Sequence, residues 1–316
     1  MNPHNDFAPS SLSHLIGQRS VIDQVTVAID AAFADGRKLD HALLVGPPGV
    51  GKSALAAVLA AEVATDLHEI LGQSISSLSD LNALLLGTKD KDVIHIDEAH
   101  EMDKQYQTAL YLALDKRQIF LNGGGKGRSP QSIPIADFTL LLSTTDEYCL
   151  LQPLRDRMKL TLRFEFYSVE ELTQVALQRG RAFRWDVDEH VFPAIAARSR
   201  GTPRLALRLL QSCRRVCRAE GAETISVEHL ERACALEQID SLGLGVTEQS
   251  YLGLLVDGPT RLNVLASSLG LPSRTISQVA EPFLIRAGLI TKDDQGRRQL
   301  TAAGHEHVSQ LRPTAV

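Results

Sequence analysis

Three short apolar runs organise the first half of the chain. They cover residues 42–45, 93–96 and 138–142, and each is followed by glycine, acidic or hydroxyl residues. Apolar positions at helical spacing over 21–35, and an alanine-rich stretch over about 53–64, predict helices beside them. Buried strands alternating with helices predict an α/β fold with a parallel sheet, whose ligands bind beyond the carboxyl ends of the strands.

The pattern becomes helical from residue 168 onward. Ser168 and Glu171 have the spacing of a capping box, in which each side chain bonds the other residue's backbone N–H. Thr202 followed by Pro203 is typical of an N-cap and first helical residue. A further helix is expected over 227–235. These elements predict a small helical domain after the sheet.

The last part of the chain has a different pattern. A boundary is expected near 241–246, which contains two glycines. Helix-like stretches follow over about 247–256, 260–269 and 273–287, and two β-prone segments then flank the turn at 293–296. Three short helices followed by a β-hairpin predict a winged-helix domain.

A separate hairpin is predicted within the first domain. β-Prone ends flank a glycine-rich turn over residues 118–134, which also contains Lys126 and Arg128. A projecting hairpin is one interpretation, and a plain surface loop is the other.

Composition narrows the class of protein. Hydrophobic residues are 44% and charged residues 22% of 316, which excludes wholesale disorder and leaves room for two or three domains. No apolar run approaches the ~20 residues of a membrane span, and no secretory signal is visible, so a cytoplasmic location is expected. Zinc binding by Cys213 and Cys217 lacks a second ligand pair, which favours free thiols.

Charge is unevenly spread along the chain. Residues 1–150 carry 11 basic and 19 acidic side chains, a net charge of −8, whereas residues 151–240 carry 15 and 13, a net charge of +2. Of those 15 basic residues 14 are arginine, which suits phosphate and carboxylate recognition. A nucleic-acid surface is therefore expected in the second half, although solvated helix faces explain the same charges.

A phosphate-binding loop is the strongest chemical signal. It fits the pattern G-x-x-x-x-G-K-[S/T] between an apolar strand and a helix. Its glycines let backbone N–H groups approach phosphate oxygens, its lysine reaches the β- and γ-phosphates, and its serine can ligate magnesium. These properties predict ATP with Mg²⁺ as the cofactors. The residues of the loop are Gly46, Pro47, Pro48, Gly49, Val50, Gly51, Lys52 and Ser53.

Two carboxylates follow the next apolar run. Asp97 is expected to hold the magnesium shell, and Glu98 to orient and polarise the attacking water. Thr144, at the end of the third run, can contact the γ-phosphate or its water. Two adjacent carboxylates favour hydrolysis over phosphoryl transfer to a small molecule, so the protein is predicted to be an ATPase.

Arginines after the third run complete the candidate site. An arginine offered to a neighbouring subunit's γ-phosphate can add about 10³–10⁵ in rate, and the stretch 154–157 contains Arg155 and Arg157. A surface ion pair is the alternative. Arg204, at a helix start, is poorly placed for the helix dipole and so suggests an anionic partner.

The order of these motifs resembles the RuvB family of AAA+ ATPases, ATP-driven motors that branch-migrate Holliday junctions. The resemblance covers residues 7–303. Besides the phosphate loop, it rests on Phe7-Ala8-Pro9, Leu15-Ile16-Gly17-Gln18, Leu39-Asp40-His41-Ala42-Leu43-Leu44, Pro153-Leu154-Arg155-Asp156-Arg157, Leu162-Arg163-Phe164-Glu165-Phe166-Tyr167, Arg200-Gly201-Thr202-Pro203-Arg204 and Glu281-Pro282-Phe283-Leu284-Ile285.

The resemblance implies an architecture and an assembly. A nucleotide-binding domain would span residues 1–167, a helical lid 168–242 and a DNA-binding winged helix 243–316. The hairpin at 118–134 would dock a RuvA-like junction-binding protein. The subunits would form a ring, expected to be a hexamer, around duplex DNA.

The resemblance also implies roles for single residues. Leu15 and Ile16 would clasp the adenine. Thr144 would be the sensor-1 residue and Arg204 the sensor-2 residue, with Arg157 as the arginine finger and Arg155 as its rival. Arg297 would contact the DNA backbone at the wing tip, and Arg298 and Arg274 are further DNA-binding candidates, although solvent-facing arginines are the alternative.

The chain departs from the family's pattern at several positions. Ala8, Glu101 and Asp146 each stand where the family usually has arginine. Met158 and Lys159 replace a usual Phe-Gly pair, and the predicted wing carries two aspartates, Asp293 and Asp294, which oppose phosphate.

Three hypotheses about function remain. The first is an ATP-hydrolysing motor subunit that drives Holliday junction branch migration in recombination and repair. The second is a nucleotide-switched AAA+ factor that remodels or loads a protein partner without translocating on DNA. The third is a structural paralogue with little turnover, which the presence of Glu98 and Arg157 disfavours. Stimulation of ATP hydrolysis by branched or duplex DNA discriminates the first two.

Overall fold

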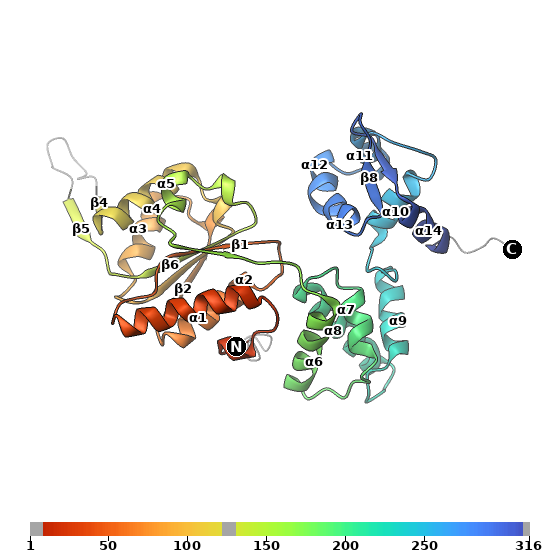
Figure 1. Ribbon diagram of the computed structural model, residues 1–316, viewed down its shortest axis with the longest axis horizontal. Helices are drawn as coiled ribbons and strands as arrows, with labels where there is room; N and C mark the ends of the chain where they lie inside the picture. Colours follow the sequence, from red (N-terminus) through yellow and green to blue (C-terminus); the bar gives the residue numbers. More distant parts are fainter. Residues whose placement is uncertain (1–8, 122–130, 312–316) are drawn as a thin grey trace. The chain divides into compact units, whose positions relative to one another are not determined.

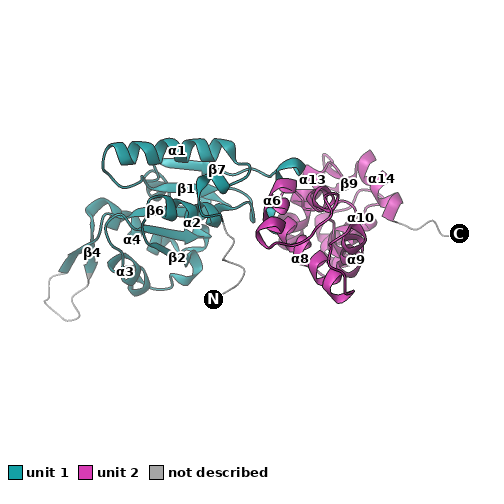
Figure 2. Ribbon diagram, turned by 90° about the horizontal axis from the view of Figure 1, so that it is seen from below, with its two compact units in different colours: residues 1–171, 202–204 teal, residues 172–201, 205–316 magenta. Residues whose placement is uncertain are grey.

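A computed structural model describes residues 9–121 and 131–311 of the chain (Figure 1). Two compact units can be distinguished (Figure 2). Unit 1 comprises residues 1–171 together with 202–204, and unit 2 comprises residues 172–201 and 205–316. Each unit is described by itself.

Unit 1 is built on a five-stranded parallel sheet with the strand order β2-β3-β6-β1-β7. The strands are β1 (Ala42–Val45), β2 (Leu67–Leu71), β3 (Val93–Asp97), β6 (Thr139–Thr144) and β7 (Leu160–Arg163). The helices are α1 (Arg19–Ala34), α2 (Lys52–Glu62), α3 (Leu78–Leu86), α4 (Lys104–Lys116) and α5 (Gln152–Arg155). The predicted parallel α/β sheet is confirmed.

The sheet is covered on both faces because its side chains alternate. Leu43, Ile94 and Leu140 pack with the helices α3 and α4. Leu44 and Leu141 point to the other face and pack with α1 and α2, and the ribbon shows the two helix layers on opposite sides of the sheet (Figure 1). The three inner strands are therefore buried on both faces and mostly apolar, which is why the sequence displays them as apolar runs.

The edge strands were missing from the sequence-based expectation. β2 and β7 contain polar residues such as Glu69, Thr161 and Arg163, because part of each edge strand faces solvent. The helices α3 and α4 were also not predicted. Short 3₁₀ turns cover Leu12–His14, Gly72–Ser74, Ala99–Glu101 and Glu147–Cys149.

The hairpin predicted over 118–134 is present. The strands β4 (Gln118–Leu121) and β5 (Gln131–Pro134) pair antiparallel, with Ile119 opposite Ile133. Ile119 is buried against the core, whereas Phe120 is 53% exposed. The glycine turn, with Lys126 and Arg128, lies outside the described residues.

The first four helices of unit 2 make up the region that the sequence predicts as a helical lid. They are α6 (Val169–Ala182), α7 (Val191–Ala197), α8 (Pro203–Ala219) and α9 (Val227–Glu237), the first residues of α6 and α8 belonging to unit 1. The predicted capping box is confirmed: the Ser168 N–H donates to Glu171 at 2.9 Å and the Glu171 N–H to Ser168 Oγ at 3.1 Å.

The predicted winged helix completes unit 2. Its elements are α10 (Val246–Leu254), α11 (Leu262–Leu269), α12 (Ser273–Thr275), α13 (Glu281–Arg286), β8 (Ile290–Lys292), β9 (Arg298–Leu300) and α14 (Ala302–Leu311). The helix-like stretch expected over 273–287 is confirmed as helical from Ser273 to Arg286, with a π-helical turn at Ile276–Ala280 between α12 and α13. The helix α14 was not predicted. No helix among the described residues is long and apolar enough to span a membrane.

Candidate functional site

The phosphate-binding loop connects β1 to α2 at the carboxyl edge of the sheet. Gly49 and Gly51 have φ of +78° and +101°, a region that only glycine adopts readily. A Cβ atom on Gly46 would lie 2.7 Å from Phe164 Cβ, so this position needs glycine for space. The loop thus has the backbone shape of an anion cradle at a helix N-terminus.

Lys52 is the first residue of α2 and is 6% exposed. Its Nζ donates to the carbonyl oxygens of Gly46 at 2.8 Å and Pro47 at 2.9 Å. Burial lowers the pKa of this ammonium from its usual value, whereas the carboxylates of Glu98 and Asp97 act in the opposite direction. The cation is therefore held inside the loop, where phosphate oxygens would meet it.

Ser53 and Asp97 are brought together as the sequence predicts. Ser53 Oγ donates to Asp97 Oδ2 at 2.8 Å, although the residues are 44 positions apart. The other oxygen, Oδ1, accepts the Glu98 N–H at 2.9 Å. A hydroxyl and a carboxylate oxygen side by side are the donors that a hard divalent cation prefers.

Glu98 follows Asp97 in a left-handed conformation, with φ of +47°. This turn brings its carbonyl close to Gly72, where a Cβ atom would approach Glu98 O to 2.6 Å. Its carboxylate Oε2 lies 3.4 Å from His100 Nδ1. The same nitrogen lies 3.2 Å from Thr144 Oγ1, so one imidazole links two of the expected catalytic residues.

His100 was not singled out from the sequence, although it stands only two residues after Glu98. Its contact with Thr144 depends on the pairing of β3 with β6, which no local pattern displays. Thr144 is itself buried, and its hydroxyl donates to the carbonyl of Asp146 and accepts that residue's N–H, both at 3.0 Å. The structure thus places Thr144 beside Glu98 with its hydroxyl held in the turn.

Asp146 has a structural role in the same turn. Its carboxylate accepts the Tyr148 N–H at 3.0 Å and the Cys149 thiol at 3.2 Å. These hydrogen bonds, the thiol first, hold the pKa of the carboxyl below its usual value. An acidic residue therefore caps the 3₁₀ turn at the position where the resemblance described above predicts arginine.

Arg157 is anchored to the helix α4. Its Nε donates to Asp115 Oδ1 at 2.7 Å, a second nitrogen bonds the same carboxylate, and the guanidinium lies 4.9 Å from the centre of the Tyr111 ring. Arg155 instead lies over Tyr148, 5.2 Å from the ring centre. Both arginines are partly exposed on unit 1, at a distance in sequence from the phosphate loop.

The N-terminal segment and the start of α8 gather near the loop. Leu15 packs against the core on the α1 and α2 face, and Ile16 is half-buried. Gln18 hydrogen-bonds Glu165 through both side-chain atoms, at 2.8 and 3.1 Å. The Arg204 N–H donates to Gly49 O at 3.3 Å, and its exposed side chain belongs to the same unit.

The three candidate DNA-binding arginines differ in their surroundings. Arg274 is exposed and donates only locally, to Gln278 at 3.0 Å. Arg297 pairs with Asp293 at 2.7 Å across the wing turn. Arg298 pairs at 2.7 Å with Glu281, whose side chain is 2% exposed, and this weighs against the expectation that Arg298 contacts DNA.

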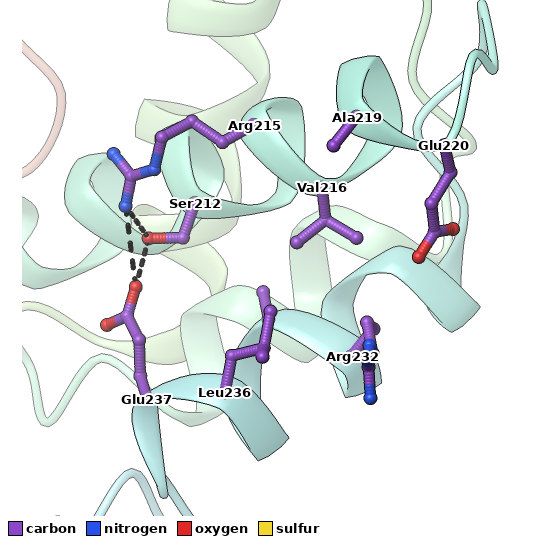
Figure 3. Close-up of a pocket in the computed structure, with 9 residues that line it drawn as sticks. Ser212, Arg215, Val216, Ala219, Glu220, Arg232, Leu236 and Glu237 are labelled. Atoms are coloured by element: carbon purple, nitrogen blue, oxygen red, sulfur yellow. Dashed lines mark hydrogen bonds and ion pairs between the residues drawn. The ribbon is translucent and has the colours of Figure 1, made fainter.

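Two other features belong to unit 2 and involve none of the predicted catalytic residues. The sulfurs of Cys213 and Cys217 are buried, and Cys217 donates to the carbonyl of Ala222 at 3.2 Å, as free thiols do. A hollow between α8 and α9 is crossed by contacts among Ser212, Arg215 and Glu237 (Figure 3). None of the predicted site residues lines this hollow.

Comparison with known proteins gives one consistent result. Three family models match in order: the Holliday junction DNA helicase RuvB P-loop domain over residues 7–164, the RuvB AAA lid domain over 167–240 and the RuvB C-terminal winged helix domain over 241–309.

Similar relatives and structures carry the same description. The chain is 36% identical over 310 residues to the Holliday junction branch migration complex subunit RuvB of Anaeromyxobacter sp. (strain K), which covers 96% of this chain and 90% of that protein. The protein of that name from Corynebacterium diphtheriae is 35% identical, with 98% and 86% covered. The solved Thermotoga maritima RuvB Holliday junction branch migration motor aligns with a TM-score of 0.83 at 33% identity, with 96% and 98% covered.

The loop geometry generates a prediction about nucleotide binding. Gly51→Ala should weaken nucleotide affinity at least about tenfold, because a Cβ at φ of +101° strains the backbone that cradles the phosphates. Gly36→Ala is the matched control, since Gly36 also has positive φ but lies in an exposed turn after α1. Binding of a fluorescent nucleotide measures both; equal loss in the two variants would contradict the assignment.

Proposed function

The chain belongs to the RuvB family, and we propose from this premise that it is a motor subunit that hydrolyses ATP to drive branch migration of Holliday junctions in recombination and repair. The observation that carries the hydrolytic half of the proposal is the hydrogen bond between Ser53 and Asp97, with Lys52 and Glu98 adjacent to it. We place this activity in the cytoplasm.

The residues present fit ATP with Mg²⁺. The amides of the loop and Lys52 would hold the β- and γ-phosphates, and Ser53 with Asp97 would hold the ion through oxygen donors. When bound, ATP with Mg²⁺ would supply a γ-phosphate whose negative charge the ion partly neutralises. Leu15 and Ile16 would contact the adenine, and Arg204, whose backbone bonds Gly49, would reach the phosphates from the start of α8.

Glu98 orients the attacking water and accepts its proton. Its carboxylate lies beside His100, which also contacts Thr144, so the imidazole couples the position of Glu98 to that of the sensor threonine. Withdrawal of Glu98 from His100 toward the water would be accompanied by a change at Thr144. This contact supports the assignment of Thr144 to the catalytic group.

Arg157 would complete the site of a neighbouring subunit in a hexameric ring. It lies after α5, is partly exposed, and is bonded to Asp115 of α4, which leaves it available to a second copy of the chain. Asp115 holds the guanidinium until a stronger anion, the γ-phosphate of the neighbour, competes for it. Arg155 remains the alternative finger.

Two surfaces would contact partners. The hairpin β4–β5, with exposed Phe120, would dock a RuvA-like protein that binds the junction. In the winged helix, Arg274 and Arg297 would contact the phosphates of duplex or branched DNA. Such contacts position a duplex without reading its sequence.

Steady-state ATP hydrolysis tests the proposal. We expect turnover that a four-way junction or linear duplex stimulates and that rising salt suppresses, because phosphate contacts release counterions. Glu98→Gln serves as the control for contaminating ATPases. Turnover that is indifferent to every DNA, with and without a RuvA-like partner, would instead favour a nucleotide-switched factor that remodels or loads a protein.

The shared site makes a prediction about mixtures. Arg157→Ala should still bind ATP but lose about 10³-fold or more in turnover, because the finger acts in the neighbour's site. Mixing it with Glu98→Gln should restore part of the activity, since some interfaces then combine an intact Glu98 with an intact Arg157. A mixture that binds ATP and assembles yet stays inactive would contradict the shared site; Arg155→Ala is the parallel test of the rival.

Substitution of the two wing arginines should have different effects on the salt dependence of DNA binding. Arg297→Ala should reduce the slope of log affinity for duplex DNA against log salt by about 0.9, the effect of one lost phosphate contact. Arg298→Ala should leave that slope unchanged and lower the melting temperature, because the buried Glu281 loses both hydrogen bonds from Arg298 and, among the described residues, keeps only Lys292, at 3.6 Å, as a cation. Fluorescence anisotropy and thermal unfolding measure the two effects; a reduced slope for Arg298→Ala at unchanged melting temperature would restore Arg298 as a DNA contact.

A further inference from the structure

A polar hollow in unit 1 lies at the edge of the sheet opposite the nucleotide site. His41 directly precedes β1 and Phe138 directly precedes β6, so both stand at the amino ends of parallel strands. The hollow has a volume of about 340 Å³, and we call it the basal hollow. Its charged lining consists of Arg37, Lys38, Asp40, Arg117, Asp137 and Lys159.

Cations outnumber carboxylates in this lining. Each aspartate is shared by two cations at 2.7–3.7 Å, in the pairs of Asp40 with Arg37 and Lys159, and of Asp137 with Arg117 and Lys38. Asp35, outside the lining, also pairs with Arg37 at 3.1 Å. The lining therefore has a net charge of +2, or +1 with Asp35 included, whereas residues 1–150 together carry −8.

Lys38 is the cation with the fewest partners. Its side chain is 15% exposed, and Asp137, at 3.7 Å, is its only ion-pair partner among the described residues. Within the part of the chain that the structure describes, Nζ donates no hydrogen bond. Burial lowers the pKa of this ammonium below its usual value, and the nearby charge of Arg117 acts in the same direction. Its three N–H donors are left to water or to an incoming anion.

His41 supplies a second open donor to the basal hollow. Its Nδ1 accepts the Leu140 N–H at 2.8 Å, so the proton of the neutral ring is on Nε2. Burial, and next the charge of Lys38, lowers the pKa of the imidazole to about 4, so the ring is neutral at pH 7. No described residue accepts a hydrogen bond from Nε2. An ammonium and an imidazole N–H are thus both offered to one anionic group.

Apolar side chains make up the rest of the lining. Leu114 and Ile135 are half-buried, and Phe138 is buried with its ring centre 6.3 Å from that of His41. Cations beside apolar surface suit a polypeptide that presents a carboxylate next to an apolar side chain. A DNA backbone instead presents a continuous row of phosphates, and the net negative charge of residues 1–150 repels it.

The basal hollow is continuous with the foot of the β4–β5 hairpin. Gln118 opposite Pro134 is the last pair of these strands, and one step beyond it the Ile135 N–H donates to Arg117 O at 3.1 Å. Arg117 and Ile135 both line the hollow. A protein docked on the hairpin would therefore lie next to the hollow.

We propose that the basal hollow binds an acidic segment of the protein that docks on the β4–β5 hairpin, and that Lys38 and His41 receive one carboxylate of that segment. The proposal rests on the docking proposed above and adds the chemistry of the contact. Arg117 and Lys159 have side chains that are 57% and 71% exposed, and they attract further acidic groups at the rim.

Substitution of Lys38 tests the proposal with a defined probe, a fluorescein-labelled hexapeptide of four glutamates and two leucines. Lys38→Met should weaken binding of this peptide about tenfold or more in fluorescence anisotropy, because a charge-assisted hydrogen bond is lost. The same peptide with glutamine in place of glutamate should bind as weakly to the natural protein.

The melting temperature distinguishes binding from a structural role. Lys38→Met should leave it unchanged or raise it, since a buried charge is removed while Asp137 keeps its pair with Arg117 at 2.7 Å. Lys104→Met is the matched control. It removes the same charge from an exposed position at the start of α4, about 20 Å along the helix from Arg117, and should change neither quantity.

The docking partner provides a second measurement. A RuvA-like protein should bind Lys38→Met about tenfold more weakly than the natural protein at low salt, and the difference should shrink at about 0.5 M salt because charges are screened. Phe120→Ala should weaken docking at both salt concentrations, since the exposed Phe120 offers an apolar contact.

The outcomes separate this inference from the proposed function. It is overturned if the natural protein does not bind the acidic peptide at about 1 mM, or if Lys38→Met binds the peptide or the RuvA-like protein as the natural protein does. A loss confined to a labelled DNA duplex would assign the hollow to nucleic acid and overturn it as well. Absence of ATP hydrolysis, or of any binding of a RuvA-like protein to the natural protein, would overturn the proposed function and leave the peptide result intact.

Discussion

The hydrogen bond between Ser53 and Asp97 joins the two halves of the site. It connects the first turn of α2 to the end of β3, and these elements are separated by the edge strand β2 and by α3 in the sequence. The parallel sheet makes the bond possible, since all five strands end at one edge. Two expected catalytic residues, Lys52 and Glu98, are the sequence neighbours of the bonded Ser53 and Asp97. Thr144 lies at the end of β6, the strand that pairs with β3.

The same sheet explains what the sequence could and could not predict. The inner strands β1, β3 and β6 are buried on both faces, so they appear as apolar runs, and the chemistry stands at their ends. The edge strands β2 and β7 have polar residues exposed on one side and therefore lack that signal. The π-helical turn at Ile276–Ala280 escaped prediction because its apolar spacing is close to that of an ordinary helix. Helix propensities do not distinguish a π-helical turn, with its i→i+5 hydrogen bonds, from an α-helical turn.

Arginines show the limit of sequence reasoning most clearly. Arg157, Arg297 and Arg298 were candidates for contacts with phosphate, and each is bound to a carboxylate of its own chain. The partner of Arg297 is four residues away and was visible in the sequence as an aspartate opposing phosphate. The partners of Arg157 and Arg298 lie 42 and 17 positions away, and only the fold brings them together. An arginine can reach a neighbour's phosphate or be fixed in an ion pair of its own chain. Which of the two applies depends on its exposure and its partners, and these are set by the tertiary structure.

The tertiary structure also explains residues that depart from the family's pattern. Asp146 replaces a usual arginine, yet its carboxylate has a definite task as the cap of the turn after Thr144. The buried imidazole of His95 likewise looks unfavourable in an apolar strand until Glu69 and Ser143 are seen on either side of it. A polar residue in such a position stabilises the site only together with its partners, so the unit on which substitution acts is the hydrogen-bonded chain rather than the single residue.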